Sequence, residues 1–135
     1  MTTKAAGLVS LALVVVLGIG WVGGASGKAA VERDRIRVSQ QMHFEKARAL
    51  VLEGRLTLVG NDYGRAGASF GSAIVELETL QRILRELSQA ELAGRIEIAV
   101  AQIKAARDEA GAQNANAWSS ADAALQALKG ISLPE

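Results

Sequence analysis

The first strongly patterned stretch of the chain is an apolar run near its N-terminus. No charged residue lies between Lys4 and Lys28, and residues 8–17 are almost entirely aliphatic. About 20 consecutive apolar residues are enough for a helix to cross the hydrocarbon core of a membrane. We therefore predict a transmembrane helix over residues 5–22 that contacts the lipid bilayer, with Trp21 at the headgroup boundary.

Glycines follow this apolar run, and they raise the question of whether the segment is retained or cleaved. Gly23-Gly24-Ala25 has the small side chains that signal peptidases accept, so a cleaved signal peptide is the alternative to a retained anchor. The same glycines are expected to separate the anchor from the next helix. The predicted organisation is a membrane anchor over 1–27, a helical domain over 28–130 and a tail over 131–135.

Basic residues after the apolar run bear on orientation. Lys28 is followed by Arg33, Arg35 and Arg37, which favours a cytoplasmic body by the positive-inside rule. A short basic leader before a long apolar core is typical of proteins whose body is exported, so it favours a body on the opposite side of the membrane from the cytoplasm. We expect a single-pass protein of a bacterial-type inner membrane, with its helical body in the periplasm. The three arginines are candidate contacts for anionic headgroups, and ordinary solubility is their alternative role.

Apolar residues recur at three- and four-residue steps along residues 29–59, which predicts one long helix. Glu45 is the one polar residue that interrupts this series. A stripe of this kind is expected to be buried against the rest of the domain. Gly60-Asn61-Asp62 then supplies a helix stop and a new N-cap. The apolar positions of the stripe are Val38, Met42, Ala49, Leu52, Leu56 and Val59.

Three further helices are predicted over about 63–87, 89–111 and 117–129. Ser88-x-x-Glu91 has the pattern of a capping box and is expected to begin the middle one, and Lys129-Gly130 ends the last. Because the connecting loops are short, neighbouring helices are expected to be antiparallel. The predicted fold class is all-α, with one N-terminal transmembrane helix followed by a small antiparallel bundle of about four helices. The expected buried positions are Ala66, Phe70, Ala73, Leu77, Leu80, Leu84 and Leu87, then Leu92, Ile96, Ala99, Ile103, Ala106 and Ala110, and finally Ala117, Ala121, Ala124 and Leu128.

Part of this pattern resembles a known repeat family. Residues 50–74 are similar to one tetratricopeptide repeat, although Glu78 stands where the family has a proline. The resemblance implies a helical hairpin that serves protein–protein interaction. One unit cannot form the groove that stacked repeats build. The matching residues are Leu50, Gly54, Asp62-Tyr63, Ala66, Phe70 and Ala73; the family pattern implies that Gly54, Ala66 and Ala73 are contact points between paired helices, with Tyr63 and Phe70 filling the space between them.

Three glycines recur within the second helix of the body. Gly64, Gly67 and Gly71 are spaced by three and four residues, so they lie on one face of the helix. A face without side chains allows another helix to approach closely. We predict that these glycines form a helix-packing or partner face.

Composition leaves little catalytic chemistry to assign. The chain has no cysteine, and its 15 basic and 14 acidic residues nearly balance, so neither thiolate chemistry nor general nucleic-acid binding is expected. His43 is the single histidine, and one histidine cannot build a zinc site by itself. We therefore predict no catalytic residue, no cofactor and no metal, and we do not expect an enzyme.

These features together predict a function through contacts with other proteins. The expected protein is a membrane-anchored helical accessory or scaffolding subunit of a larger membrane-associated complex. Its expected partners are other protein subunits that are themselves membrane proteins. The alternative is a bundle exported to the periplasm that senses or binds a small molecule between its helices.

Overall fold

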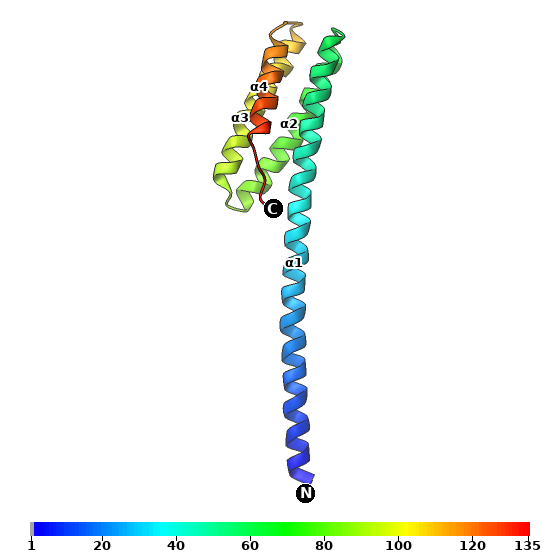
Figure 1. Cartoon of the computed structure of the whole chain (residues 1–135), viewed down its shortest axis with the longest axis vertical. Coiled ribbons are helices and arrows are strands. Elements are labelled where there is room, and N and C mark those ends of the chain that lie inside the picture. Colours follow the sequence, from blue (N-terminus) through cyan, green and yellow to red (C-terminus); the bar gives the residue numbers. More distant parts are fainter. Residues whose placement is uncertain (1) are drawn as a thin grey trace. The chain divides into compact units, whose positions relative to one another are not determined.

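The computed structural model describes the backbone of residues 2–135 and the side chains of residues 27–135. Within this part the chain forms helices, turns and a short extended C-terminal segment, and contains no strand. The prediction of an all-α fold is therefore confirmed. The helices are α1 (Thr2–Val59), α2 (Tyr63–Glu86), α3 (Ala90–Gly111) and α4 (Ala117–Lys129), as Figure 1 shows.

α1 is one helix where two were predicted. It continues through Gly23 and Gly24, so the expected break between the anchor and the first body helix was wrong. A glycine inside a helix costs only about 1 kcal/mol relative to alanine, which good helix formers on either side can offset. No glycine in the part of the chain with described side chains has a positive φ, and Pro134 is the single proline of the sequence.

The chain divides into two units, Met1–Arg37 and Val38–Glu135. The predicted transmembrane segment over 5–22 lies outside the residues whose side chains are described. In the described part of the chain, no helix combines the length and the apolar character that crossing a membrane requires. The second unit contains the last part of α1 together with α2, α3 and α4.

The connection from α1 to α2 confirms the predicted stop and cap. Asn61 has a φ of 56°, in the left-handed region that asparagine tolerates better than most residues. The carboxylate of Asp62 accepts a hydrogen bond from the backbone N–H of Arg65 at 3.1 Å. This bond satisfies one of the free N–H groups at the start of α2.

The predicted capping box at Ser88 was wrong. Ser88 has a φ of 59°, and its backbone N–H donates to the carbonyl oxygen of Arg85 at 3.0 Å. Ser88 therefore belongs to the left-handed turn that closes α2. Gln89 is the residue that precedes α3, and its side chain makes no capping hydrogen bond.

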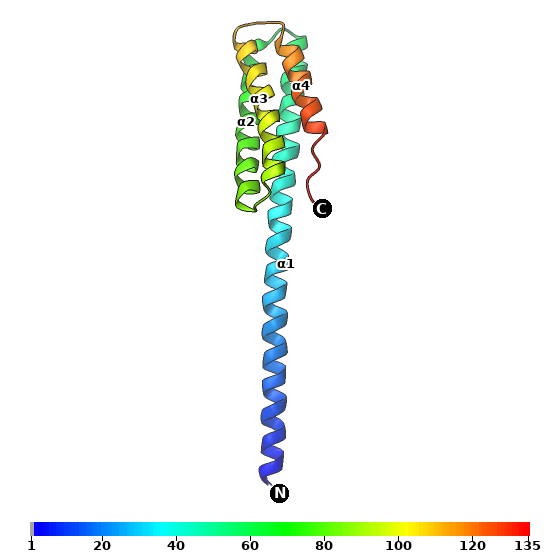
Figure 2. The same cartoon turned by 90° about the vertical axis from the view of Figure 1, so that its left-hand side faces the viewer.

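The predicted antiparallel packing of neighbouring helices is confirmed for α2 and α3. The two helices are antiparallel neighbours, and α3 also lies beside α4 (Figures 1 and 2). Of the positions predicted to be buried on these helices, Leu87 is exposed and Leu92 is half-buried, while the others form the core. Full burial of each large aliphatic side chain stabilises the fold by about 1.5–3 kcal/mol. The largest fully buried side chains of these helices are Phe70, Leu77, Leu80, Leu84, Ile96, Ile103 and Leu128.

The predicted burial of the apolar stripe on α1 was wrong, because another face of α1 turns toward the core. The core-facing residues form a second series with the same three- and four-residue steps. This series is displaced by two positions, which is about 200° around the helix, so the two series occupy opposite faces. The core-facing series is Gln40, Phe44, Ala47, Val51, Gly54 and Leu58.

α1 and α2 approach closely at Gly54. A Cβ atom on this residue would lie 2.5 Å from Cε1 of Phe70, whose ring is fully buried. Ala66 and Ala73 are fully buried on the same helix as that ring. Small residues on both helices therefore make room for one aromatic side chain.

Candidate interaction surface

The apolar face of α1 that lies outside the core is the most extensive exposed hydrophobic feature of the second unit. Its five larger side chains are each between 46% and 62% exposed. Single exposed hydrophobic residues are normal on soluble surfaces, but a row of them along one helix face is typical of a binding surface. We call this row the α1 stripe, and it consists of Val38, Met42, Ala49, Leu52, Leu56 and Val59.

The α1 stripe borders a hollow near the end of the helix. This hollow has a volume of about 440 Å³, and Ala49, Leu52 and Leu56 line its apolar side. Glu53 and Arg65 line its polar side, where Arg65 Nη2 lies 3.6 Å from Glu53 Oε1. The stripe is therefore part of a shaped surface that combines an apolar wall with a charged edge.

Charged residues beside the α1 stripe are held by the neighbouring helices. On one edge, Arg55 forms an ion pair with Asp122 of α4, and its guanidinium carbon lies 5.1 Å from the centre of the Trp118 ring. On the other edge, Lys46 Nζ lies 2.6 Å from Oε1 of Glu76 on α2. The two edges of α1 are therefore linked to different helices, and the buried series on the opposite face keeps the stripe turned away from the core.

Glu76 is the centre of a polar cluster between α1 and α2. His43 Nδ1 donates to Glu76 Oε2 at 2.6 Å, and Lys46 binds the other carboxylate oxygen. The side chains of Glu76 and His43 are only 15% and 19% exposed. The hydrogen bond from Lys46, followed by that from His43, holds the pKa of Glu76 below its ordinary value.

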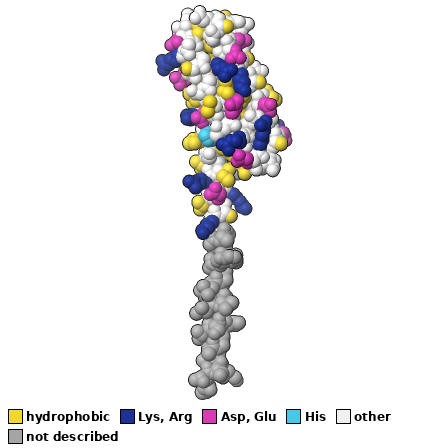
Figure 3. All heavy atoms as spheres, turned by 180° about the vertical axis from the view of Figure 1, so that it is seen from behind, with side chains coloured by type: hydrophobic (Ala, Val, Ile, Leu, Met, Phe, Trp, Pro, Cys, Tyr) yellow, Lys and Arg dark blue, Asp and Glu magenta, His cyan; other side chains and the backbone are white. Residues whose placement is uncertain are grey.

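The cluster links two helices, and its hydrogen-bonding groups are used within the fold. Figure 3 shows the histidine at the surface, with acidic, basic and hydrophobic side chains around it. Where side chains are described, no three histidine, aspartate or glutamate residues gather in an arrangement that suits a metal ion. Sequence reasoning did not find this cluster, because nothing in the helical spacing links His43 to a carboxylate 33 positions away.

Replacing Glu76 with glutamine is expected to cost about 1–2 kcal/mol of stability at pH 7, because two charge-assisted hydrogen bonds are weakened. The pKa of Glu76 is lower in the folded protein than in the unfolded chain. The stabilisation by the Glu76 carboxylate is therefore fully present above the pKa of the unfolded state, and it is lost as the pH falls through the pKa of the folded state. The ordinary pKa of this carboxyl group is 4.5. As the pH falls below that value, E76Q should therefore lose less stability than the native chain does. Urea unfolding of the full-length protein between pH 3 and 7, followed by circular dichroism, measures both effects.

Glu78 provides the matched control for this prediction. It pairs with Lys104 at 3.0 Å, and both side chains are about half exposed, so the pair is worth at most about 1 kcal/mol. E78Q should therefore cost less stability at pH 7 than E76Q. Equal costs for the two variants would contradict the role assigned to Glu76.

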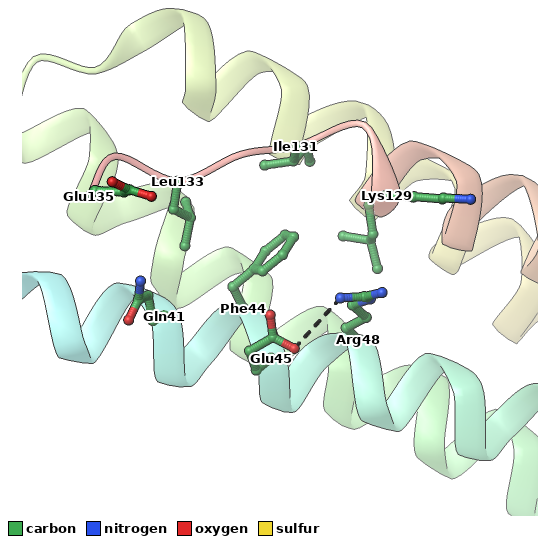
Figure 4. A pocket seen from close by; sticks show the side chains of 9 residues that line it. Gln41, Phe44, Glu45, Arg48, Lys129, Ile131, Leu133 and Glu135 are labelled. Carbon is green, nitrogen blue, oxygen red and sulfur yellow. Dashed lines mark ion pairs between the residues drawn. The ribbon is translucent and has the colours of Figure 1, made fainter.

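A second hollow, of about 470 Å³, lies between α1 and the C-terminal segment. Phe44 points from α1 toward Ile131 and Leu133, as Figure 4 shows. On the rim, Arg48 Nη1 lies 3.8 Å from Glu45 Oε2. Ile131 is buried and Leu133 is half-buried, so the C-terminal segment packs onto the helices at this place.

The predicted glycine face on α2 meets other helices at one position. A Cβ atom on Gly67 would lie 4.0 Å from the carbonyl oxygen of Arg107 on α3. A Cβ atom on Gly71 would meet nothing within 4 Å, and one on Gly64 would meet only Oδ1 of Asp62, at 4.0 Å. The use of all three glycines as one partner face stays a prediction.

The predicted membrane-proximal arginines lie in the first unit. Arg33, Arg35 and Arg37 are all exposed, and Arg37 Nη2 lies 3.0 Å from Oδ1 of Asp34, one turn earlier. Residues two positions apart are separated by about 200° around a helix, so the three arginines do not share one face. Their contact with headgroups stays a prediction.

Comparisons with known proteins give no match. The sequence fits no protein-family model, and neither curated proteins nor solved structures show a significant similarity to it. The tetratricopeptide resemblance of residues 50–74 therefore stays a prediction. The packing around Gly54 and Phe70 stands independently of it, on the contacts described above.

Proposed function

We propose that this protein is a membrane-anchored helical accessory or scaffolding subunit that acts through protein–protein contacts, with the α1 stripe as its principal binding surface. The observation that carries the proposal is a row of large apolar side chains, each about half exposed, along one helix of a small domain. Removal of apolar surface from water on association is favourable by about 25 cal/mol per Å². The apolar run over 5–22 supports the membrane anchor.

The surroundings of the α1 stripe support binding to a protein. The stripe lies on a continuous helix whose opposite face is packed in the core, so a partner does not have to order it first. The charged groups beside it supply the polar rim that surrounds the apolar centre of a typical interface. The polar cluster around Glu76 joins α1 to α2, which supports a structural role for that cluster.

The proposal predicts that L52K together with L56K abolishes the binding of partner subunits. Two lysines in the middle of the apolar surface place unpaired charges in the interface, which should weaken binding at least 100-fold. Both leucines are about half exposed, so the fold should be retained. The measurement is mild-detergent purification of the tagged full-length protein, with mass spectrometry of the proteins that co-purify in stoichiometric amounts.

V75K and I98K are the matched controls, because these residues are 62% and 61% exposed and lie on α2 and α3. Each should keep the co-purifying subunits at the level of the native chain. Loss of the same subunits in V75K or I98K, or their retention in the double stripe variant, would contradict the proposed surface. Circular dichroism of each purified variant shows whether the fold is retained.

A small-molecule binding bundle is the second candidate function. It is favoured by the hollow between α1 and the C-terminal segment, which has an apolar floor at Phe44 and charged residues on its rim. Native mass spectrometry of the purified protein tests this function. A bound small molecule that is lost in L133W, which fills the hollow, would favour this candidate over the scaffold.

A further inference from the structure

The α1 stripe has the residue order of a coiled-coil seam. Its steps of four and three residues continue without interruption from Val38 to Val59 once Glu45 is included. In heptad notation, the a positions are Met42, Ala49 and Leu56, and the d positions are Val38, Glu45, Leu52 and Val59. A seam of this kind is matched by another helix with the same repeat.

We infer that the partner of the α1 stripe is a second copy of this chain, laid parallel to the first along α1. The inference rests on the proposed function, since both assign the α1 stripe to binding. Two copies of the stripe facing each other bury on the order of 1,000 Å² of surface, which reaches the lower limit for a specific interface. The core of each domain lies on the opposite face of α1, so two copies meet without collision between their cores.

The charges beside the seam favour the parallel order. In a parallel pair, a g residue faces the e residue five positions later on the other helix. Arg48 occupies a g position and Glu53 the matching e position, so each copy's Arg48 faces the partner's Glu53. Within the chain these residues have only long contacts, 3.8 Å from Arg48 to Glu45 and 3.6 Å from Glu53 to Arg65, and both are about half exposed. Their charges are therefore available to a partner.

The antiparallel order has a less favourable charge pattern. It places g residues opposite g residues, which brings Arg48 toward the partner's Arg55. It also places Lys46 beside the partner's Glu53. Lys46 is already paired within its own chain, where its Nζ lies 2.6 Å from Oε1 of Glu76. The antiparallel order therefore has no free attractive pair at its edges. The parallel order has Arg48 beside the partner's Glu53 at each edge, and its like-charge contact is the one between the two copies of Glu45 in the seam.

Glu45 is the one charged residue within the seam of the parallel pair. Two copies of Glu45 face each other in one d layer, where their like charges repel and lower the stability of the dimer. E45L is therefore expected to tighten the dimer roughly tenfold. Analytical ultracentrifugation of the full-length protein in mild detergent measures this change as a lower dissociation constant.

Cysteine cross-linking tests both the identity and the direction of the partner. The chain has no cysteine of its own, so a single cysteine reports one position. In a parallel pair, V59C lies beside the V59C of the second copy, and oxidation of native membranes with copper phenanthroline links the two chains. V75C is the control, because both valines are 62% exposed and Val75 lies on α2. We expect a linked dimer for V59C and none for V75C.

Other results overturn the inference in distinguishable ways. A link that forms only when V59C and M42C chains are mixed shows antiparallel pairing and overturns the direction. A monomeric chain without a V59C link overturns the second copy as partner. If L52K together with L56K still removes other subunits in that case, the proposed function stands without the dimer. A linked dimer without any other subunit supports the inference and the binding role of the α1 stripe, and it overturns only the part of the proposed function that assigns other subunits to the stripe.

Charge reversal gives an independent check of direction. R48E alone should weaken a parallel dimer roughly fivefold, because it places two glutamates beside each other at both edges. R48E combined with E53R restores opposite charges and should recover most of the affinity. An R48E variant that dimerises more tightly than the native chain would show antiparallel pairing and overturn the inference.

Discussion

Replacing Gly54 with leucine should lower the free energy of unfolding by about 3 kcal/mol or more. Even a single Cβ atom at this position would lie 2.5 Å from Cε1 of Phe70. The Phe70 ring is fully buried between α1 and α2, so it cannot swing into solvent to make room. Urea unfolding of the full-length protein in mild detergent measures the loss, which is large for a domain whose total stability is about 5–15 kcal/mol.

Gly94 is the control for this substitution. It lies within α3, and a Cβ atom there would meet nothing within 4 Å. G94A is expected to stabilise the protein by about 0.5–1 kcal/mol, because alanine loses less backbone entropy in a helix. If G54L were as stable as the native chain, the close approach of α1 and α2 described above would be incorrect.

Phe70→Ala is expected to cost about 3–5 kcal/mol, the other large effect in this protein. The ring is completely buried at the contact between α1 and α2, and its removal leaves a cavity bordered by Gly54. Glycine has no side chain that can move into this space, so the cavity cannot close by a change of rotamer there. Thermal unfolding should show a clearly lower midpoint for this variant.

Val75→Ala on the same helix provides the comparison. Val75 is 62% exposed, so its truncation removes little buried surface and should change stability by no more than about 0.5 kcal/mol. A loss of less than about 1 kcal/mol for Phe70→Ala would show that the ring is not packed between the two helices. The combination of Phe70→Ala with Gly54→Leu should cost less than the sum of the two, because each change affects the same space.

The helices α2, α3 and α4 were predictable because each has one apolar face. On α2 the series from Ala66 to Leu84 has no competing apolar series, so periodicity identifies the buried side. On α4 the buried residues Ala117, Ala121, Ala124 and Leu128 follow the same rule. The end of α1 and the cap at Asp62 were also predictable, since both depend on local residues.

The core-facing side of α1 could not be predicted by the same reasoning. α1 carries two apolar series, and the one with larger aliphatic residues is exposed. The buried series includes Gln40 and Gly54, which hydrophobicity does not identify as core residues. Periodicity shows that a face is apolar, but it does not show whether that face contacts its own domain or another chain.

The polar cluster and the hollows depend on contacts between distant residues. His43 and Glu76 lie on different helices, and their contact follows from how α1 and α2 pack at Gly54 and Phe70. The hollow at Phe44 needs the C-terminal segment to return to α1. Such contacts become predictable only once the packing of the helices is known.

The most direct test of the binding surface is the reactivity of single cysteines in native membranes. L56C and I98C are compared, because the native residues are 58% and 61% exposed in the isolated chain. N-ethylmaleimide crosses membranes, so the side on which the body lies does not affect the comparison. If the α1 stripe is covered by a protein partner, L56C reacts much more slowly than I98C in membranes and equally fast after the assembly is dissociated. Equal rates in native membranes would contradict the account, since the stripe would then be open to solvent where the protein works.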